Sequence, residues 1–169
     1  MTVIIDDAGS GDLLFGVVIG AFNDKNEDFR YDVVDVRYFQ PPIFCQKLYL
    51  KQASKIVFSL LNRLKIMIDE PILVCRSYIF DEAVKDLRQR FGVDLIQKIK
   101  VTGLPQLFTE TAYLDELRNL GYSPIEDREE RRAKSFFHMM RWLKRNPEKM
   151  KYAKTGWPRL SKYPLFRNR

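Results

Sequence analysis

The sequence has few of the residues that build metal-binding and nucleophilic sites, with two cysteines and one histidine among 169 residues. Cys45 and Cys75 do not have the spacing of a zinc motif, and His138 alone cannot complete a zinc set or a Ser-His-Asp triad. Two separated cysteines are typical of buried, reduced thiols in a cytosolic protein, and a disulfide between them is the less expected alternative. The sequence therefore excludes zinc-finger proteins and triad hydrolases.

Long apolar runs are also missing. No stretch approaches the ~20 apolar residues of a membrane span, and the N-terminus enters an apolar segment without a basic leader. We therefore expect a cytoplasmic protein with no membrane partner. The length suits one domain, and 46% hydrophobic with 30% charged residues is an ordinary globular mixture rather than a disordered one.

The positive charge is concentrated at one end of the chain. Residues 131–169 hold thirteen Lys and Arg side chains and one acid, Glu148, so their net charge is +12. The whole chain has a net charge of +7, so residues 1–130 have a net charge of −5. A basic region joined to an acidic body indicates a polyanionic partner, and we expect nucleic acid. A solvated helix face and tail is the alternative. The sequence gives no indication of oligomeric state.

Periodicity and breaker residues predict an α/β chain with the order βββαβαβα. The expected fold is a single domain over residues 1–146 that includes an extra C-terminal helix. Residues 147–169 form a basic, aromatic tail that we expect to pack on the domain or on a partner. The expected strands are 3–5, 13–22, 29–39, 72–75 and 98–101, and the expected helices are 44–68, 79–91, 107–120 and 127–145.

The opening stretch VIIDDAGSGDLLFGVVIGAF carries the clearest chemical signal. Asp6 and Asp7 follow a buried apolar strand, and the turn Gly9, Ser10, Gly11 leads into a second one. A carboxylate at the end of a buried strand is costly unless it is solvated, hydrogen-bonded or bound to a cation. In a regular strand the two side chains point to opposite sides, so a kink or bulge is needed for both to serve one site.

The string DDAGSG resembles the opening motif of type 2 ribonucleases H, which reads Asp-Glu-Ala-Gly-Arg-Gly. Ser10 stands in place of its arginine, and Cys75 stands where the family places an acid after the fourth strand. The resemblance implies the wider ribonuclease H-like fold, a mixed five-stranded sheet flanked by helices. It also implies that Asp6 and Asp7 bind metal and that the glycine turn contacts nucleic acid.

If the chain is an enzyme, the resemblance implies a phosphodiesterase that uses two Mg²⁺ or Mn²⁺ ions about 3.5 to 4 Å apart. The expected catalytic residues are Asp6, Asp7 and Glu110, since the fold usually delivers its final carboxylate after the fifth strand. The same three residues and Asp127 are the expected metal ligands. Asp127, Glu129 and Glu130 are the alternatives to Glu110 as the final carboxylate. The expected nucleic-acid contacts are Gly9, Ser10, Gly11, Lys47, Lys51, Lys134 and Arg141.

Two other functions remain open. One is a ribonuclease H-like module that binds nucleic acid without catalysis, which the missing acid at position 75 favours. The other is a phosphate or nucleotide binder that uses residues 7–10, because Asp7, Ala8, Gly9 and Ser10 are similar to the first phosphate loop of actin-like ATPases. Those ATPases enclose a nucleotide between two such domains, and this chain is too short to supply both.

Overall fold

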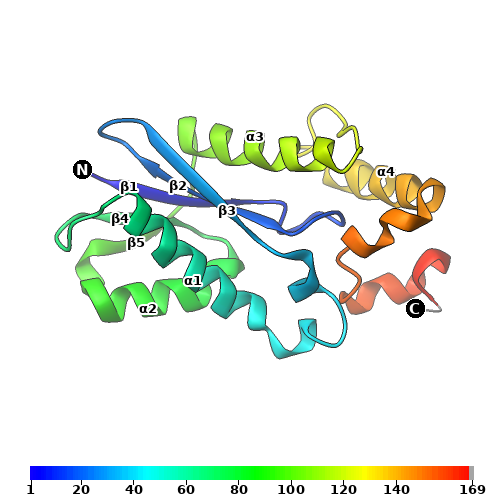
Figure 1. Cartoon of the computed structure of the whole chain (residues 1–169), viewed down its shortest axis with the longest axis horizontal. Helices are drawn as coiled ribbons and strands as arrows, with labels where there is room; N and C mark the ends of the chain where they lie inside the picture. Colours follow the sequence, from blue (N-terminus) through cyan, green and yellow to red (C-terminus); the bar gives the residue numbers. More distant parts are fainter. Residues whose placement is uncertain (168–169) are drawn as a thin grey trace.

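Five strands form one mixed sheet that lies between two layers of helices (Figure 1). The computed structural model describes residues 1–167. The sheet order is β3-β2-β1-β4-β5, in which β1 pairs antiparallel with β2 and parallel with β4. The strands are β1 (Val3–Ala8), β2 (Val17–Asn23), β3 (Asp28–Val34), β4 (Ile72–Cys75) and β5 (Ile96–Ile99).

The helices divide the core into two clusters. Helices α1 (Leu48–Arg63) and α2 (Asp81–Phe91) cover one face of the sheet, and α3 (Leu104–Asn119) covers the other (Figure 1). Alternate residues of a strand face opposite sides, so Ile5 and Ile19 join the cluster under α1 and α2, while Ala8 and Val18 join the cluster under α3. The α/β class and the mixed, helix-flanked sheet agree with the sequence prediction.

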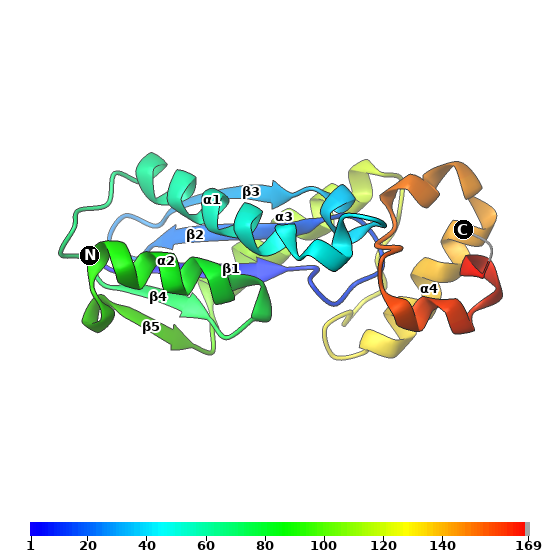
Figure 2. The same ribbon diagram turned by 90° about the horizontal axis from the view of Figure 1, so that it is seen from below.

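The C-terminal region lies beyond the C-terminal end of β1 (Figure 2). It consists of α4 (Arg132–Arg145) and three short 3₁₀ segments, Pro147–Tyr152, Pro158–Lys162 and Pro164–Phe166. Met150, Leu160 and Phe166 are buried in the cluster under α3, so the described part of the tail packs on the rest of the chain. Asn168 and Arg169, which the tail prediction included, lie outside the described residues.

Two strands are shorter than the sequence predicts. The second strand begins at Val17 instead of residue 13, because Leu14 bridges to Ala153 and Phe15 has a left-handed backbone (φ 66°). The third ends at Val34 instead of residue 39, because the Asp35 side chain accepts a hydrogen bond from the backbone N–H of Arg37 (2.8 Å) and starts a 3₁₀ turn.

Several other boundaries also differ from the prediction. The first helix spans Leu48–Arg63 rather than 44–68, because Lys47 and Lys65 flank it with left-handed backbones (φ 53° and 55°). The last helix begins at Arg132 rather than residue 127, and Asp127 is also left-handed (φ 53°). The fifth strand is Ile96–Ile99 rather than 98–101. Helix α2 begins at Asp81 rather than residue 79, after a 3₁₀ turn, and α3 begins at Leu104 rather than residue 107.

Two absences complete the description. Cys45 and Cys75 are both free, so the alternative of a disulfide between them is wrong. Cys45 is exposed, so the prediction of two buried thiols is also wrong. Within residues 1–167, none of the helices has the length and apolar character needed to cross a bilayer.

Candidate functional site

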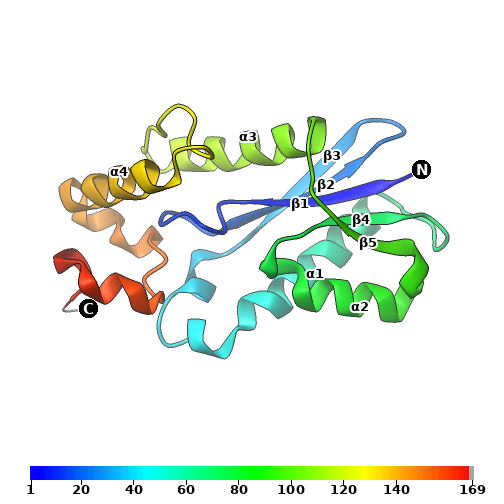
Figure 3. The same cartoon turned by 180° about the vertical axis from the view of Figure 1, so that it is seen from behind.

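A cleft of about 620 Å³ opens at the C-terminal ends of β1 and β4, and Arg132, the first residue of α4, also lines it. Figure 3 shows these elements from behind. Pairing between these parallel strands stops at Ile5 and Val74, so the residues that follow are free to line a cavity. The edge where parallel strands end is the usual place for a site in an α/β sheet. The cleft is lined by Asp6, Asp7, the turn residues Gly9, Ser10 and Gly11, Cys75 and Glu110, among others.

Asp6 and Asp7 converge without the kink or bulge that the sequence predicts. Their pairing with β2 is continuous, with Asp6 opposite Gly20 and Asp7 opposite Ile19. Even so, one carboxylate oxygen of each residue and the Sγ of Cys75 lie within 4.8 Å of one another. The prediction of a bulge is wrong because β4 ends beside them, which leaves both sides of β1 open to the same cleft.

Burial dominates the electrostatics of the aspartate pair. Burial raises the pKa of Asp6 to about 6, against the opposing hydrogen bond from Cys75, and the charge of Asp7 adds to the rise. Burial likewise raises the pKa of Asp7, while hydrogen bonds from Ser10 and Ser77 oppose it. Among residues 1–167, no Lys or Arg nitrogen lies within 4.0 Å of either carboxylate. Neither carboxylate is therefore ion-paired, and the charge of Arg132 lowers the pKa of Asp7 only from beyond this distance.

Cys75 is the last residue of β4 and completes this cluster. Burial, followed by the charges of Asp6 and Asp7, raises the pKa of its thiol to about 12. With no cation present, Cys75 is a neutral thiol beside two carboxylates. We define these three residues as the Asp6/Asp7/Cys75 cluster.

Glu110 reaches the same cleft from α3, but its carboxylate is already paired. Arg128 forms ion pairs with both Glu110 and Asp12, and its guanidinium lies 4.9 Å from the centre of the Tyr113 ring. Burial and then Glu129 raise the pKa of Glu110, whereas the positive charge of Arg128 opposes the rise. We call Arg128 with Asp12 and Glu110 the Arg128 clamp.

The turn after β1 is fixed from both sides of the cleft. Gly9 has a left-handed backbone (φ 87°), and a Cβ there would lie 2.4 Å from the ring of Tyr113, so no larger residue fits. Tyr78 donates a hydrogen bond to the carbonyl of Ser10 (3.3 Å), and Tyr113 donates one to the carbonyl of Leu14 (2.9 Å). The glycine turn is thus a rigid wall of the cleft.

A buried lysine also holds this turn. Lys154 is 0% exposed, and its ammonium donates hydrogen bonds to the carbonyls of Asp12 (2.9 Å) and Leu14 (3.2 Å). Its backbone N–H donates to Leu13, and the N–H of Phe15 donates to Tyr152 (2.7 Å). The C-terminal region therefore supports the wall of the cleft, a role that its basic composition did not indicate.

Three basic residues that the sequence analysis missed line the cleft: Arg76, Lys100 and Arg132. All three are exposed at residue level. Arg76 and Lys100 each follow the last residue of a parallel strand, and this position was the signal that could have identified them. Together they give the acidic cluster a positive rim.

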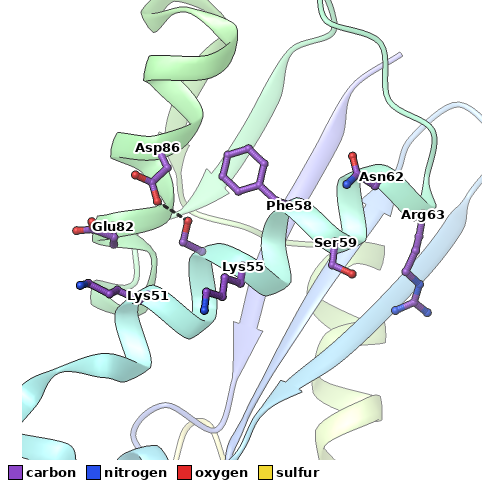
Figure 4. A pocket seen from close by; sticks show the side chains of 9 residues that line it. Lys51, Lys55, Phe58, Ser59, Asn62, Arg63, Glu82 and Asp86 are labelled. Carbon is purple, nitrogen blue, oxygen red and sulfur yellow. Dashed lines mark hydrogen bonds between the residues drawn. The ribbon is translucent and has the colours of Figure 1, made fainter.

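Other predicted residues lie outside the cleft. Asp127 lines a neighbouring cavity of about 470 Å³, so the structure does not bring it to Asp6 and Asp7. Lys51 lines a separate groove of about 820 Å³ between α1 and α2 (Figure 4). Lys47 is exposed and directly precedes α1. Lys134 and Arg141 are exposed on α4.

Comparisons of the chain with family models, curated proteins and solved structures gave no match. The class of protein is therefore defined by the fold and the cleft alone. It is an α/β protein with a mixed sheet and an acidic cluster at the ends of two parallel strands.

Proposed function

We propose that this chain is a metal-dependent, nuclease-like protein of the ribonuclease H-like fold that binds nucleic acid at the cleft. One observation carries the proposal: Asp6, Asp7 and Glu110 line a single cleft whose rim includes Arg76, Lys100 and Arg132. The sheet order supports it as well, because a three-stranded antiparallel meander followed by two parallel strands is the order that the resemblance implies.

The donor set fits a divalent cation. Two neighbouring carboxylates, one of them 5% exposed and neither paired with a Lys or Arg among residues 1–167, suit Mg²⁺ or Mn²⁺ with water and phosphate oxygens as further ligands. A cation bound there would lower the pKa of a bound water and neutralise charge on the phosphate. Asp6 and Asp7 would hold it, and Arg132, Arg76 and Lys100 would hold the phosphates.

The Arg128 clamp favours a second candidate function. A guanidinium that already neutralises Glu110 leaves this carboxylate less available as a metal ligand, and Cys75 stands where the family has an acid. A ribonuclease H-like module that binds nucleic acid without cleaving it is consistent with both features.

Thermal melting with and without Mn²⁺ or Mg²⁺ tests the metal site. A cation that binds only the folded chain at 100 times its Kd should raise the midpoint by about 5 to 10 °C. We expect this rise in the wild type and in Asp69→Asn, an exposed control outside the cleft, and its loss in Asp7→Asn.

Cleavage assays on RNA, DNA and hybrid substrates then separate the two functions. Metal-dependent cleavage that Asp7→Asn abolishes supports the nuclease. Binding of nucleic acid without cleavage in either metal would support the non-catalytic module. A midpoint unchanged at millimolar metal would contradict the metal site.

A further inference from the structure

We propose that Cys75 is the third ligand of the metal site and that the cleft therefore prefers a thiophilic divalent cation, such as Zn²⁺ or Co²⁺, to Mg²⁺. The inference rests on the proposed function because it concerns the same cleft, and it names the class of metal. Its ligands would be a carboxylate oxygen from each of Asp6 and Asp7 and the Sγ of Cys75, which would bind as a thiolate and release its proton to solvent when the metal enters.

The geometry brings these three atoms together from two strands. Asp6 and Asp7 lie inside β1, just past its last pair with β4 and before its end at Ala8, and Cys75 ends the parallel neighbour β4, so the sheet itself fixes their separation. The three donor atoms lie within 4.8 Å of one another. Metal bonds of about 2.0 to 2.3 Å keep two ligands of one ion within about 4.6 Å of each other, so a small side-chain movement suffices.

The charge of the cluster points independently to a cation. The chain has other carboxylates of low exposure in the same region, Asp12 and Glu110, and both are neutralised by the internal cation Arg128. Asp6 is as deeply buried as Asp12, at 5% against 6% exposed, yet no Lys or Arg of residues 1–167 lies within 4.0 Å of its carboxylate. A buried carboxylate with no counter-ion is costly, and a bound cation offsets this cost.

The kind of donor determines the preference among metals. Mg²⁺ takes oxygen ligands almost exclusively, whereas thiolate ligands favour Zn²⁺ and other softer ions. A carboxylate at position 75 would complete an all-oxygen site for Mg²⁺ or Mn²⁺. Cys75 replaces that oxygen with sulfur, and this moves the preference toward thiophilic ions.

Titration with Co²⁺ under reducing, oxygen-free conditions tests the inference, because a Co²⁺–thiolate bond gives a charge-transfer absorption band in the near ultraviolet. The chain has two cysteines, so Cys45→Ser leaves Cys75 as the only sulfur ligand of this kind. Cys45 is exposed and is not part of the Asp6/Asp7/Cys75 cluster, so its substitution is the matched control. We expect the band in the wild type and in Cys45→Ser.

The band should be absent in Cys75→Ser and in Asp7→Asn. Loss of the thiolate should weaken Co²⁺ binding by at least about tenfold. Substitution of a residue that only hydrogen-bonds to a metal ligand already lowers metal affinity by about 10 to 100 times. In Cys75→Asp the preference of Co²⁺ over Mg²⁺, measured by competition, should fall. Co²⁺ binding without the band in Cys45→Ser, or unchanged affinity in Cys75→Ser, would overturn the proposal.

This experiment distinguishes failure of the inference from failure of the proposed function. A charge-transfer band without cleavage of any nucleic acid would leave the thiolate ligand in place and reject the nuclease. Cleavage supported by Mg²⁺, with no band from Co²⁺, would retain the nuclease and reject Cys75 as a ligand.

Discussion

At the scale of single residues, Asp6 lowers the stability of the metal-free protein. Burial raises the pKa of its carboxyl to about 6 in the folded chain, from an ordinary value of 3.8. Between these two values the folded state binds more protons than the unfolded state, so the free energy of unfolding must fall as the pH rises through that window. The loss is nearly complete at pH 7 and is the cost of keeping a carboxylate in this cleft.

Asp6→Asn should therefore stabilise the metal-free protein. The two pKa values imply a gain of about 3 kcal/mol in the free energy of unfolding above pH 7, and almost none below pH 4. Urea denaturation in a chelating buffer at several pH values measures the difference. Asp69→Asn, at an exposed site, should give parallel curves for variant and wild type. A variant less stable than the wild type at pH 7 would contradict the account of Asp6.

The sequence identifies some residues of the cleft and cannot identify others. Asp6, Asp7 and Gly9 could be predicted because their signal is local, two carboxylates and a turn at the end of an apolar run. Arg128 could not, because its partners Asp12 and Glu110 are 116 and 18 residues away along the chain. Its position among the acids at 126–130 suggested a helix start, and only the tertiary structure turns its side chain inward.

At the scale of elements, the segment between α3 and α4 is positioned by the Arg128 clamp. Arg128 is 8% exposed, and it connects this segment to the turn after β1 and to α3. Asp127 before it has a left-handed backbone, so the segment leaves the helical path that its sequence predicts. The clamp therefore determines where α4 begins and where Arg132 lies relative to the cleft.

Removing the cation of the clamp should be strongly destabilising. Arg128→Gln leaves Asp12 and Glu110 without a counter-ion, and we expect a loss of about 3 to 5 kcal/mol in the free energy of unfolding. Arg118→Gln is the matched control, because the ion pair of Arg118 with Asp115 is exposed on both sides and should contribute about 1 kcal/mol or less. Chemical denaturation of both variants measures the two losses. Similar small losses would show that the clamp does not hold this segment.

The order of the elements could be predicted, but several of their ends could not. Periodicity of apolar residues gives βββαβαβα because each element buries one face or both. The ends depend on distant contacts. Leu14 is apolar and continues the pattern of β2, yet it pairs with Ala153 at the far end of the chain. Lys47 fits the helical period of the sequence, but its backbone is left-handed, so α1 begins only at Leu48.

At the scale of the whole molecule, the C-terminal region is both a support and a basic surface. Lys154 and Ala153 support the turn after β1, so this region cannot be removed without disturbing the cleft. Lys154 is buried, and the other eleven Lys and Arg residues between 131 and 167 are wholly or partly exposed, with none within 4.0 Å of a carboxylate in residues 1–167. Such an unpaired basic surface favours a polyanionic partner.

Part of this surface forms a row along one side of α4, where Lys134, His138, Arg141 and Arg145 follow one another at helical spacing. Arg132, which lines the cleft, lies about half a turn away around the same helix. Burial and then the charges of Arg141, Arg145 and Lys134 lower the pKa of His138, as expected for cations gathered around it. Under the proposed function, a nucleic-acid strand bound in the cleft would have to pass from Arg132 around α4 to reach this row.

Replacing this row should change the salt dependence of binding more than its specificity. Each phosphate contact contributes about 0.7 to 0.9 to the slope of log K against log salt, so Lys134→Gln/Arg141→Gln/Arg145→Gln should reduce that slope by about 2 to 3. The matched control is Lys51→Gln/Lys55→Gln/Arg63→Gln on α1, which removes the same charge from the outer groove in Figure 4. Fluorescence anisotropy with a labelled oligonucleotide at several salt concentrations measures both slopes. If binding depends only on net charge, the slope will fall equally in the two triple variants. If nucleic acid binds along α4, the slope will fall only in the α4 triple variant.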